Sequence, residues 1–218
     1  MLLARRQFLQ RGYYQPLLDA IAETLTDNTP TSATPTTLLD SGCGEGYYLN
    51  YITSKLTTDI IAGGFDIAKD AVQMAAKQYP DIDWVCASSK NIPLQDNSIG
   101  GILNVFAPTS EEEFARILSR DGVLIVVGPG PQHLIEIKQT IYSTLKPYAE
   151  PTPLIGLNKV AQRQVTFDIR LDSSEEWKDL LTMTPFFHRG NTEAKQQLLS
   201  KPPLSLRCDF IISAYQHQ

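Results

Sequence analysis

The sequence predicts an α/β fold with a doubly wound, mostly parallel sheet of seven strands and an antiparallel edge strand near the C-terminus. Short apolar segments alternate with amphipathic ones from residue 37 to residue 145. Three glycines, Gly42, Gly44 and Gly46, directly follow the first apolar segment. Two further strand-like segments come late in the chain. Strands that alternate with helices form βαβ units, whose right-handed crossovers favour a parallel sheet covered on both faces.

The N-terminal segment, residues 1–36, is expected to be helical. Apolar residues recur at helical spacing over positions 4–26, with an interruption at Gly12. Pro16 suits the first turn of a second helix, because its missing N–H would have no partner there. Polar and proline residues over 27–36 predict a loop.

Five strands and four helices are expected in the alternating region. The predicted strands are 37–40, 60–65, 83–87, 100–106 and 122–128. The predicted helices are 46–56, 68–78, 111–118 and 132–145. The segment 122–128 (GVLIVVG) is apolar throughout, which is typical of a strand buried on both faces of a sheet.

The pattern changes after Pro147. Residues 148–163 are expected to be irregular, and 165–171 alternates as a strand does. Residues 173–183 open with Ser-Ser-Glu-Glu, which predicts a helix with a capping box. The last predicted strand is 206–214, and together with 165–171 it supplies the antiparallel end of the sheet.

Composition excludes several classes of protein. The chain has 218 residues, of which 42% are hydrophobic, enough for one large domain. It has no apolar stretch of membrane-spanning length and no signal peptide, so a cytoplasmic protein is expected. Cys43, Cys86 and Cys208 are widely separated, so neither a metal site nor a disulfide framework is expected. The net charge of −5 argues against a domain that binds nucleic acid unaided.

The glycine cluster predicts a ligand site, because ligands of open α/β sheets bind at the carboxyl ends of the strands. Gly42 allows a tight turn, Gly44 lets the backbone approach a ligand, and Gly46 lets the next helix pack near the strand. Asp40 ends the first strand and precedes this turn. The unsatisfied N–H groups at the start of the following helix point toward the same place.

A nucleoside is the ligand that the later strand ends favour. Asp66 ends the second strand, where a carboxylate accepts two hydrogen bonds from a ribose diol. Ala87 and Ser88 lie at the end of the third strand, where an adenine edge is expected. Asp66 does not distinguish S-adenosylmethionine (SAM) from NAD. Taken singly, Asp66 is also explained as a helix cap, Asp40 as a turn cap and Ser88 as an ordinary loop residue.

The spacing G-x-G-x-G after Asp40 resembles motif I of the class I SAM-dependent methyltransferases, whose sheet is Rossmann-like. The stretches LLDSGCGEGYY, GPGPQHLIEIKQTIY and LTMTPFFHR, among others along nearly the whole chain, resemble the RlmA-type 23S rRNA (guanine-N1)-methyltransferases. That family normally begins with a zinc-binding module, which this sequence lacks. The resemblance implies residues 1–36 as a cap over the cofactor and 37–218 as the methyltransferase domain.

The cofactor implied is SAM, with S-adenosyl-L-homocysteine (SAH) as product. By resemblance Tyr14 covers the cofactor, Glu45 accepts from its ammonium group and His133 donates to its carboxylate. Without the resemblance, Tyr14 is explained as a core aromatic and His133 as a helix N-terminal residue. The complete expected cofactor set is Tyr14, Asp40, Gly42, Gly44, Glu45, Asp66, Ile67, Ala87, Ser88 and His133.

The implied reaction is methyl transfer to N1 of a guanine in a loop of 23S rRNA, the expected partner. Asn104, Phe106 and Pro108 are expected to face the substrate, and no residue is assigned as general base. Two alternatives stay open: a small-molecule SAM methyltransferase, and a non-catalytic SAM-binding remnant of the rRNA enzyme. No membrane or metal partner is expected, and a homodimer is a candidate oligomeric state.

Overall fold

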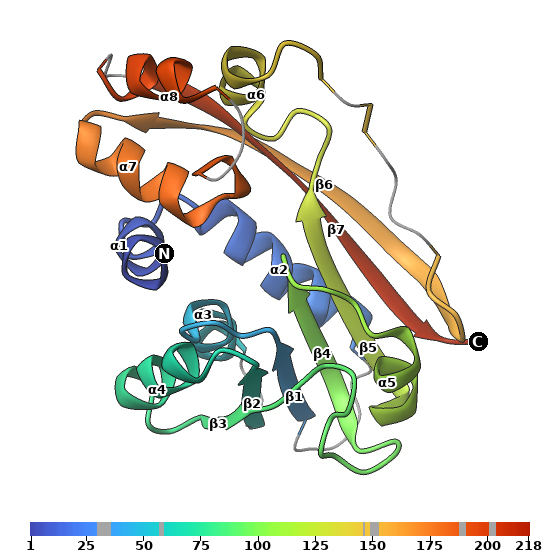
Figure 1. Ribbon diagram of the computed structural model, residues 1–218. Helices are drawn as coiled ribbons and strands as arrows, with labels where there is room; N and C mark the ends of the chain where they lie inside the picture. The colour runs from blue at the N-terminus through green and yellow to red at the C-terminus, as the bar shows by residue number, and fades with distance from the viewer. Residues whose placement is uncertain (30–35, 57–58, 146, 149–152, 188–190, 201–203) are drawn as a thin grey trace. The chain divides into compact units, whose positions relative to one another are not determined.

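Seven strands form one sheet in the order β3-β2-β1-β4-β5-β7-β6 in the computed structural model (Figure 1). The structure describes residues 1–218 apart from 30–35, 57–58, 146, 149–152, 188–190 and 201–203. The strand order reverses at β1. Strands β2 and β3 lie on one side of β1, and β4, which follows β3 in the chain, pairs with β1 on its other side. This reversal is the doubly wound arrangement that the sequence predicts.

The chain divides into two compact units. Unit 1 comprises Met1–Pro16, Pro129–Glu150 and Gln164–Phe210, and unit 2 comprises Leu17–Gly128, Pro151–Arg163 and Ile211–Gln218. The boundary expected between residues 36 and 37 lies inside unit 2. The role of residues 1–36 as a cap over the cofactor stays a prediction.

The parallel strands of unit 2 bring their carboxyl ends to one edge. The strands are β1 (Thr36–Ser41), β2 (Ile60–Asp66), β3 (Asp83–Cys86), β4 (Ile99–Val105) and β5 (Leu118–Pro129). Ser41 is in register with Phe65, and Asp66 with Cys86. The residues that follow each strand therefore emerge at neighbouring points.

Four helices accompany these strands: α2 (Gln15–Asn28), α3 (Tyr47–Lys55), α4 (Lys69–Gln78) and α5 (Glu111–Ile117). Helix α4 buries a narrow stripe formed by Ala71, Val72 and Ala75. Asp70 in its first turn and Lys77 in its last complement the helix dipole. The predicted helices 46–56, 68–78 and 111–118 are confirmed to within two residues at each end.

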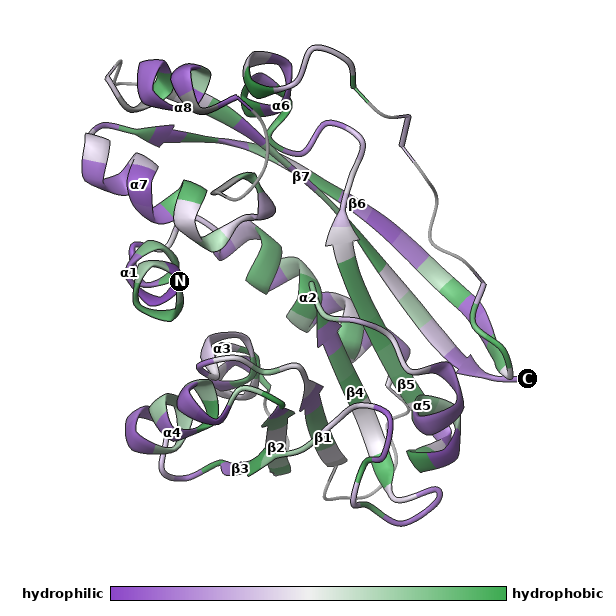
Figure 2. Ribbon diagram, viewed as in Figure 1, coloured by the Kyte–Doolittle hydropathy of each residue, from purple (hydrophilic) through white to green (hydrophobic). Residues whose placement is uncertain are grey.

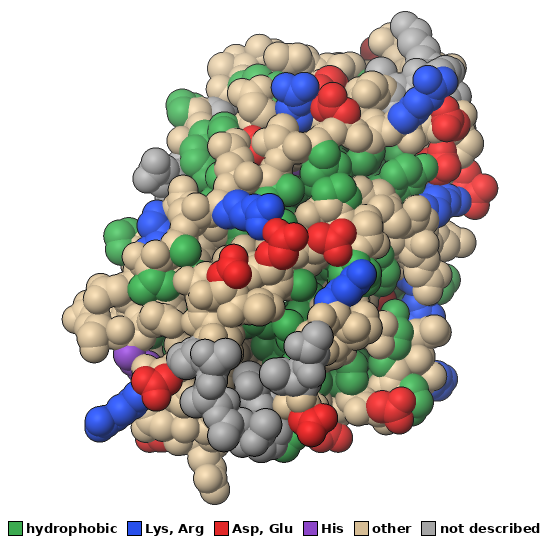
Figure 3. All heavy atoms as spheres, turned by 180° about the vertical axis from the view of Figure 1, so that it is seen from behind, with side chains coloured by type: hydrophobic (Ala, Val, Ile, Leu, Met, Phe, Trp, Pro, Cys, Tyr) green, Lys and Arg blue, Asp and Glu red, His purple; other side chains and the backbone are tan. Residues whose placement is uncertain are grey.

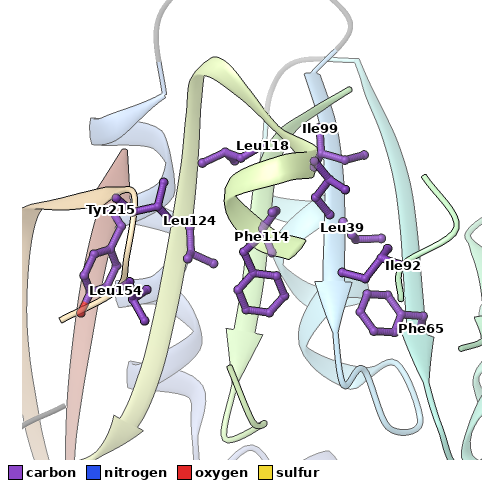
Figure 4. Packing of buried hydrophobic residues seen from close by; sticks show 12 residues of the cluster. Leu39, Phe65, Ile92, Ile99, Phe114, Leu118, Leu124, Leu154 and Tyr215 are labelled. Carbon is purple, nitrogen blue, oxygen red and sulfur yellow. The ribbon is translucent and has the colours of Figure 1, made fainter. Parts of the chain in front are cut away.

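A hydrophobic cluster fills unit 2 beneath α5. Phe114 of α5 is fully buried and lies between Leu124 of β5 and Leu39 of β1 (Figure 4). Most of β5 is drawn in the hydrophobic colour in Figure 2, as expected for a strand buried on both faces. Truncating a buried phenylalanine of this kind costs about 3–5 kcal/mol, so Phe114 anchors the helix to the sheet.

Unit 1 contains helices and the adjoining parts of two long strands. Its elements are α1 (Leu2–Gln10), α6 (Ile135–Ile141), α7 (Ser174–Met183), the 3₁₀ turn η1 (Pro185–Phe187), α8 (Thr192–Leu199), and parts of β6 (Leu157–Leu171) and β7 (Leu204–His217). Ser173 and Glu176 form the predicted capping box of α7. Arg11, just after α1, donates to Asp179 of α7 at 3.1 Å.

The antiparallel strand near the C-terminus is confirmed. In Figure 1 the arrow of β7 runs opposite to those of β5 and β6, and β7 is inserted between them, so β6 forms the edge. Two predictions were wrong. Residues 157–163, expected to be irregular, belong to β6, and the helix expected over 132–145 covers only Ile135–Ile141. Most of the predicted 27–36 loop lies outside the described residues, and α2 extends to Asn28.

Candidate functional site

The glycine turn of unit 2 is tied to the end of β2. The N–H groups of Gly42 and Cys43 both donate to the carbonyl oxygen of Phe65, at 2.9 and 3.0 Å. The turn therefore leaves β1 and passes directly over the neighbouring strand end. This places the residues after β1 beside Asp66, as the sequence predicts for a single ligand site.

At two positions of this turn, glycine is required both by the backbone conformation and by close packing. Gly42 and Gly46 have φ values of +75° and +84°, in the left-handed region that other residues rarely adopt. A Cβ atom on Gly42 would lie 2.5 Å from that of Ala107, and one on Gly46 would lie 2.6 Å from the ring of Trp84. The glycines thus allow both the backbone conformation and the close packing of α3 against β3.

Asp66 joins the glycine turn to the start of α4. Its Oδ2 accepts from the N–H of Gly44 at 2.9 Å, and its Oδ1 accepts from the N–H of Ala68 at 2.8 Å. Asp66 thus accepts from the N–H of Ala68, but Ala68 itself is the N-cap of α4, so the interpretation of Asp66 as the helix cap does not hold. An ionised carboxylate has about four acceptor positions, so room remains for a diol beside these two donors.

The residues after β2 and β3 form an exposed rim beside Asp66. Ile67 is 77% exposed, so its apolar side chain is accessible to a ligand at this rim. The N–H of Ala87 donates to the carbonyl of Asp66 at 3.2 Å, so the β3 end lies against the β2 end. Ser88 also makes the local turn that its loop interpretation requires, since its Oγ accepts from Lys90 at 3.2 Å.

Two carboxylates are buried where β1 leads into α3. Asp40 at the end of β1 and Glu45 directly before Gly46 are each 1% exposed. Burying a carboxylate is costly unless donors or a cation accompany it. Two buried carboxylates, which accept hydrogen bonds, and a turn of backbone N–H groups, which donate them, fit a ligand that carries both an ammonium group and hydrogen-bond acceptors, as SAM does.

The end of β4 carries a strained aromatic residue. Phe106 has a φ of +56°, a conformation that a bulky residue rarely adopts and that is often found at functional sites. Its ring is 42% exposed and contacts Tyr48 edge to face, with centroids 6.2 Å apart. Asn104 is buried and donates from Nδ2 to the carbonyl of Pro108 at 3.1 Å. Within the described part of the chain, Asn104 Oδ1 has no hydrogen-bond partner.

Tyr14 and His133 lie together in unit 1, on an aromatic cluster centred on Phe210. The ring centroids of Tyr14 and His133 lie 5.1 and 4.6 Å from that of Phe210. Tyr14 is buried, as the core-aromatic interpretation requires. Whether either residue contacts the cofactor stays a prediction.

His133 is neutral at physiological pH, because burial lowers its pKa to about 3. Its Nδ1 accepts from the N–H of Asp209 at 3.4 Å, which assigns the ring proton to Nε2. A neutral ring of this tautomer is able to donate from Nε2, the role that the resemblance implies. Asp209 and Phe210 were not singled out from the sequence, although an aspartate inside the apolar run 208–214 is a recognisable signal.

Surface charge is mixed on the face drawn in Figure 3, where acidic and basic side chains are interspersed with hydrophobic ones. Among the described residues, no group of three or more His, Cys, Asp or Glu side chains is arranged to hold a metal ion. Likewise, no helix in the described segments has the length and apolar character needed to span a membrane.

Comparison with known proteins identifies a methyltransferase domain over residues 38–122. The chain is 37% identical over 134 residues to YxjB of Bacillus subtilis, a protein provisionally named as a 23S rRNA (guanine-N(1)-)-methyltransferase, covering 61% of this chain and 47% of YxjB. It is 34% identical over 138 residues to the 23S rRNA (guanine(748)-N(1))-methyltransferase of Streptomyces fradiae, covering 63% and 49%. The chain thus spans about half the length of the curated relatives it matches.

Solved structures share the fold at low sequence identity. A provisionally assigned methyltransferase of Bacillus halodurans superposes with a TM-score of 0.60 at 15% identity, over 91% of this chain and 97% of that one. The [4+2]-cyclase SpnF superposes with a TM-score of 0.56 at 16% identity, over 91% and 81%. The fold alone therefore does not determine the reaction. S-adenosyl-L-methionine is the cofactor of a methyltransferase domain of this kind, and the chain contains such a domain with the class I methyltransferase fold, homologous to proteins named as 23S rRNA (guanine-N(1)-)-methyltransferases.

Proposed function

We propose that the chain binds SAM at the strand ends of unit 2 and transfers its methyl group to N1 of a guanine in 23S rRNA. The observation that supports this most is the 2.9 Å hydrogen bond from the Gly44 N–H to Asp66 Oδ2. It joins the turn expected to approach the cofactor and the carboxylate expected to bind its ribose. The names of the relatives support the guanine-N1 target.

Each residue at the site has a distinct proposed role. Asp66 accepts from the ribose hydroxyls, and the exposed Ile67 covers one face of the adenine with an apolar side chain. Glu45 accepts from the ammonium group. Phe106 offers an exposed ring on which the target base stacks. Aromatic side chains stack in this way with bases of single-stranded or flipped nucleotides. A guanine inside a duplex would be out of reach, so the target must be a loop or flipped base.

SAM supplies a methyl group that is already activated by the sulfonium. As the bond from guanine N1 to the methyl carbon forms, the bond from sulfur to that carbon breaks and SAH remains. The proton on N1 must leave to solvent or to a base within hydrogen-bonding reach. The chain's contribution is alignment of the two reactants and exclusion of water, and no side chain is assigned as the base.

A small-molecule methyltransferase is the second candidate. The net charge of −5 favours it, because RNA binding usually requires a basic surface. The biotin biosynthesis protein BioHC of Cellvibrio japonicus is also 29% identical over 154 residues, covering 66% of this chain and 29% of that protein. A chain that binds SAM without transferring its methyl group is the third.

Titration calorimetry with SAH tests the cofactor site. Asp66→Asn should weaken binding about tenfold or more, because hydrogen bonds to a charged acceptor are the stronger ones. Asp70→Asn is a matched control, since Asp70 is an exposed aspartate in the first turn of α4. No heat and no thermal shift at saturating SAH would refute the proposed cofactor site.

Methyl transfer is tested separately with labelled SAM. Unmethylated 23S rRNA, its hairpin fragments and a metabolite extract are incubated with the protein, and nucleosides are analysed by mass spectrometry. Label in 1-methylguanosine supports the proposal. Label only in small molecules favours the second candidate, and binding of SAH without any transfer favours the third.

A further inference from the structure

Asn104 is a buried polar residue of β4 whose side chain is bonded to the loop that follows the strand. It is 1% exposed, and its Nδ2 donates to the carbonyl oxygen of Pro108 at 3.1 Å. A carbonyl oxygen only accepts, so this bond fixes the orientation of the amide and leaves Oδ1 facing away from Pro108. Among the residues that the structure describes, Oδ1 has no hydrogen-bond partner. An unpaired buried oxygen lowers stability and an apolar side chain would avoid that cost, so the amide calls for an explanation.

The loop Phe106–Pro108 begins with the strained residue Phe106, whose φ is +56°. A bulky residue keeps such a backbone conformation only where its surroundings hold it. At the start of the loop, the N–H of Phe106 donates to the carbonyl of Val127 on β5 at 3.0 Å. At its end, the carbonyl of Pro108 accepts from the side chain of Asn104. These two hydrogen bonds hold the loop at both ends, and the one from Asn104 is the bond that a substitution can remove.

The loop packs against the glycine turn within unit 2. A Cβ atom on Gly42 would lie 2.5 Å from the Cβ of Ala107, so Ala107 uses the space that the glycine leaves. The ring of Phe106 contacts Tyr48 of α3, the helix that begins directly after the turn, with centroids 6.2 Å apart. The conformation of the loop therefore decides where the exposed ring of Phe106 lies relative to the turn proposed to bind SAM.

We propose that Asn104 is a positioning residue for Phe106: its amide holds the loop Phe106–Pro108 in the conformation that presents the ring of Phe106 to an unpaired base. The inference rests on the proposed function, since the stacked base is part of that proposal. Asn104 does not itself touch the base. Without its hydrogen bond a relaxed loop competes with the held one, and the affinity for the base falls with the population of the held loop.

Asn104→Val separates positioning from packing. Valine removes both the donor and the unpaired Oδ1 and suits a buried strand, so we expect a folded variant of nearly unchanged stability. Its affinity for an unpaired RNA oligonucleotide with a single guanine among uridines should fall about fivefold, the effect of one net hydrogen bond on the held loop. Thr37→Val is the matched control. Thr37 Oγ1 donates to Ser98 at 3.1 Å and accepts from the N–H of Gly100 at 2.8 Å, at the other end of β4, so this variant should lose stability and keep the RNA affinity.

The environment of the Phe106 ring is a readout that a general loss of stability would not change. The chain has eight phenylalanines, so ¹⁹F spectra of protein labelled with fluorophenylalanine resolve them, and Phe106→Leu assigns the signal. Without any ligand, Asn104→Val should shift or broaden the Phe106 signal, and Thr37→Val should leave it as in wild type. This measurement needs neither SAM nor RNA, so it tests the link from Asn104 to Phe106 even if the wild-type protein binds no RNA and the proposed function fails.

The proposal is supported if Asn104→Val is folded, changes the Phe106 signal and weakens RNA binding while Thr37→Val does neither. It is overturned if the folded valine variant keeps the wild-type signal, whatever its affinity, or changes the signal and binds RNA as wild type does. Equal effects of Thr37→Val also overturn it, because loss of stability would then be the cause. If Asn104→Val does not fold, Asn104→Ala is judged by the same outcomes. If neither variant folds, the amide is required by the core itself and the proposal is wrong.

Discussion

Replacing Glu113 with glutamine should lower the free energy of unfolding by about 2 kcal/mol at neutral pH. Glu113 lies on α5 and closes the segment that leads from β3 to β4. Its Oε2 accepts from the N–H of Ile92 at 2.6 Å, and its Oε1 accepts from Arg116 Nε at 2.7 Å. The same guanidinium donates to the carbonyl of Leu94 at 2.8 Å. The ion pair of Glu113 and Arg116 therefore holds residues 92–94, which belong to no helix or strand, against α5.

The magnitude follows from the ionisation of Glu113. Hydrogen bonding to Arg116, assisted by the Ile92 N–H, lowers its pKa from 4.5 to about 2, against an opposing effect of burial. This difference between the unfolded and folded pKa sets an upper bound of about 3 kcal/mol on the stabilisation. The side chains of Glu113 and Arg116 are 17% and 30% exposed. Solvent screening therefore reduces the stabilisation below this bound, to the loss of about 2 kcal/mol that we expect for Glu113→Gln.

The pH dependence has a defined sign. The folded-state pKa of Glu113 is depressed, so its stabilisation is complete well above pH 4.5 and is lost as the pH falls toward 2. Urea unfolding of wild type and Glu113→Gln should therefore differ at pH 7 by more than twice the difference at pH 3. Glu112→Gln, an exposed neighbour on the same helix, is the control. An equal loss in the control, or a difference that does not change with pH, would refute the reasoning.

Two further changes test the glycine turn and the contact between α1 and α7. Gly46→Ala should destabilise the protein by about 2 kcal/mol or more in urea unfolding, because the new Cβ would meet Trp84 at a φ of +84°. Gly12→Ala has a similar φ of +79° but open space around it, so an equal cost there would show that backbone strain alone is responsible. Arg11→Met should cost about 1–3 kcal/mol at pH 7, because the largely buried Asp179 loses its partner at 3.1 Å. Burial raises the pKa of Asp179, so this cost should shrink in acid as the carboxylate takes up a proton, and a cost that grew in acid would contradict the assignment.

Short apolar segments were enough to predict the strands of unit 2, of which β4 is almost entirely buried, although β3 is mostly exposed. The prediction failed for a long strand segment that is polar. The segment 157–163 of β6 is largely polar and mostly exposed, so no alternation marks it, and it is a strand only because β7 pairs with it. Helix α8 went unpredicted for a similar reason. One local signal is Asn191, whose side chain caps the N–H groups of Glu193 and Ala194.

The proximity of Gly44, Asp66 and Ala87 was predictable, because each lies at or just after the end of a strand whose neighbours in the sheet are also neighbours along the chain. Asp66 is 22 residues from Gly44, and the strand between them fixes where both lie. Asp209 is different. Its donors Gln132 and Gln164 are 77 and 45 residues away, and no local pattern relates them. A contact of that kind depends on which strand is inserted beside which, and that order is a property of the whole sheet.

Asp66 and Asp209 each have a carboxylate that accepts from the backbone N–H of a glycine-containing turn, but the two side chains differ in exposure, so we expect different consequences when each is changed. Asp66 is half-buried, so a ligand hydroxyl can share its oxygens with the Gly44 N–H. Asp209 is 0% exposed, and both of its carboxylate oxygens accept from protein donors, so it is closed to a ligand. The asparagine variants should therefore diverge. The change at Asp66 should weaken SAH binding with little effect on stability, whereas the change at Asp209 should leave binding intact, because asparagine still supplies the acceptor that the turn requires.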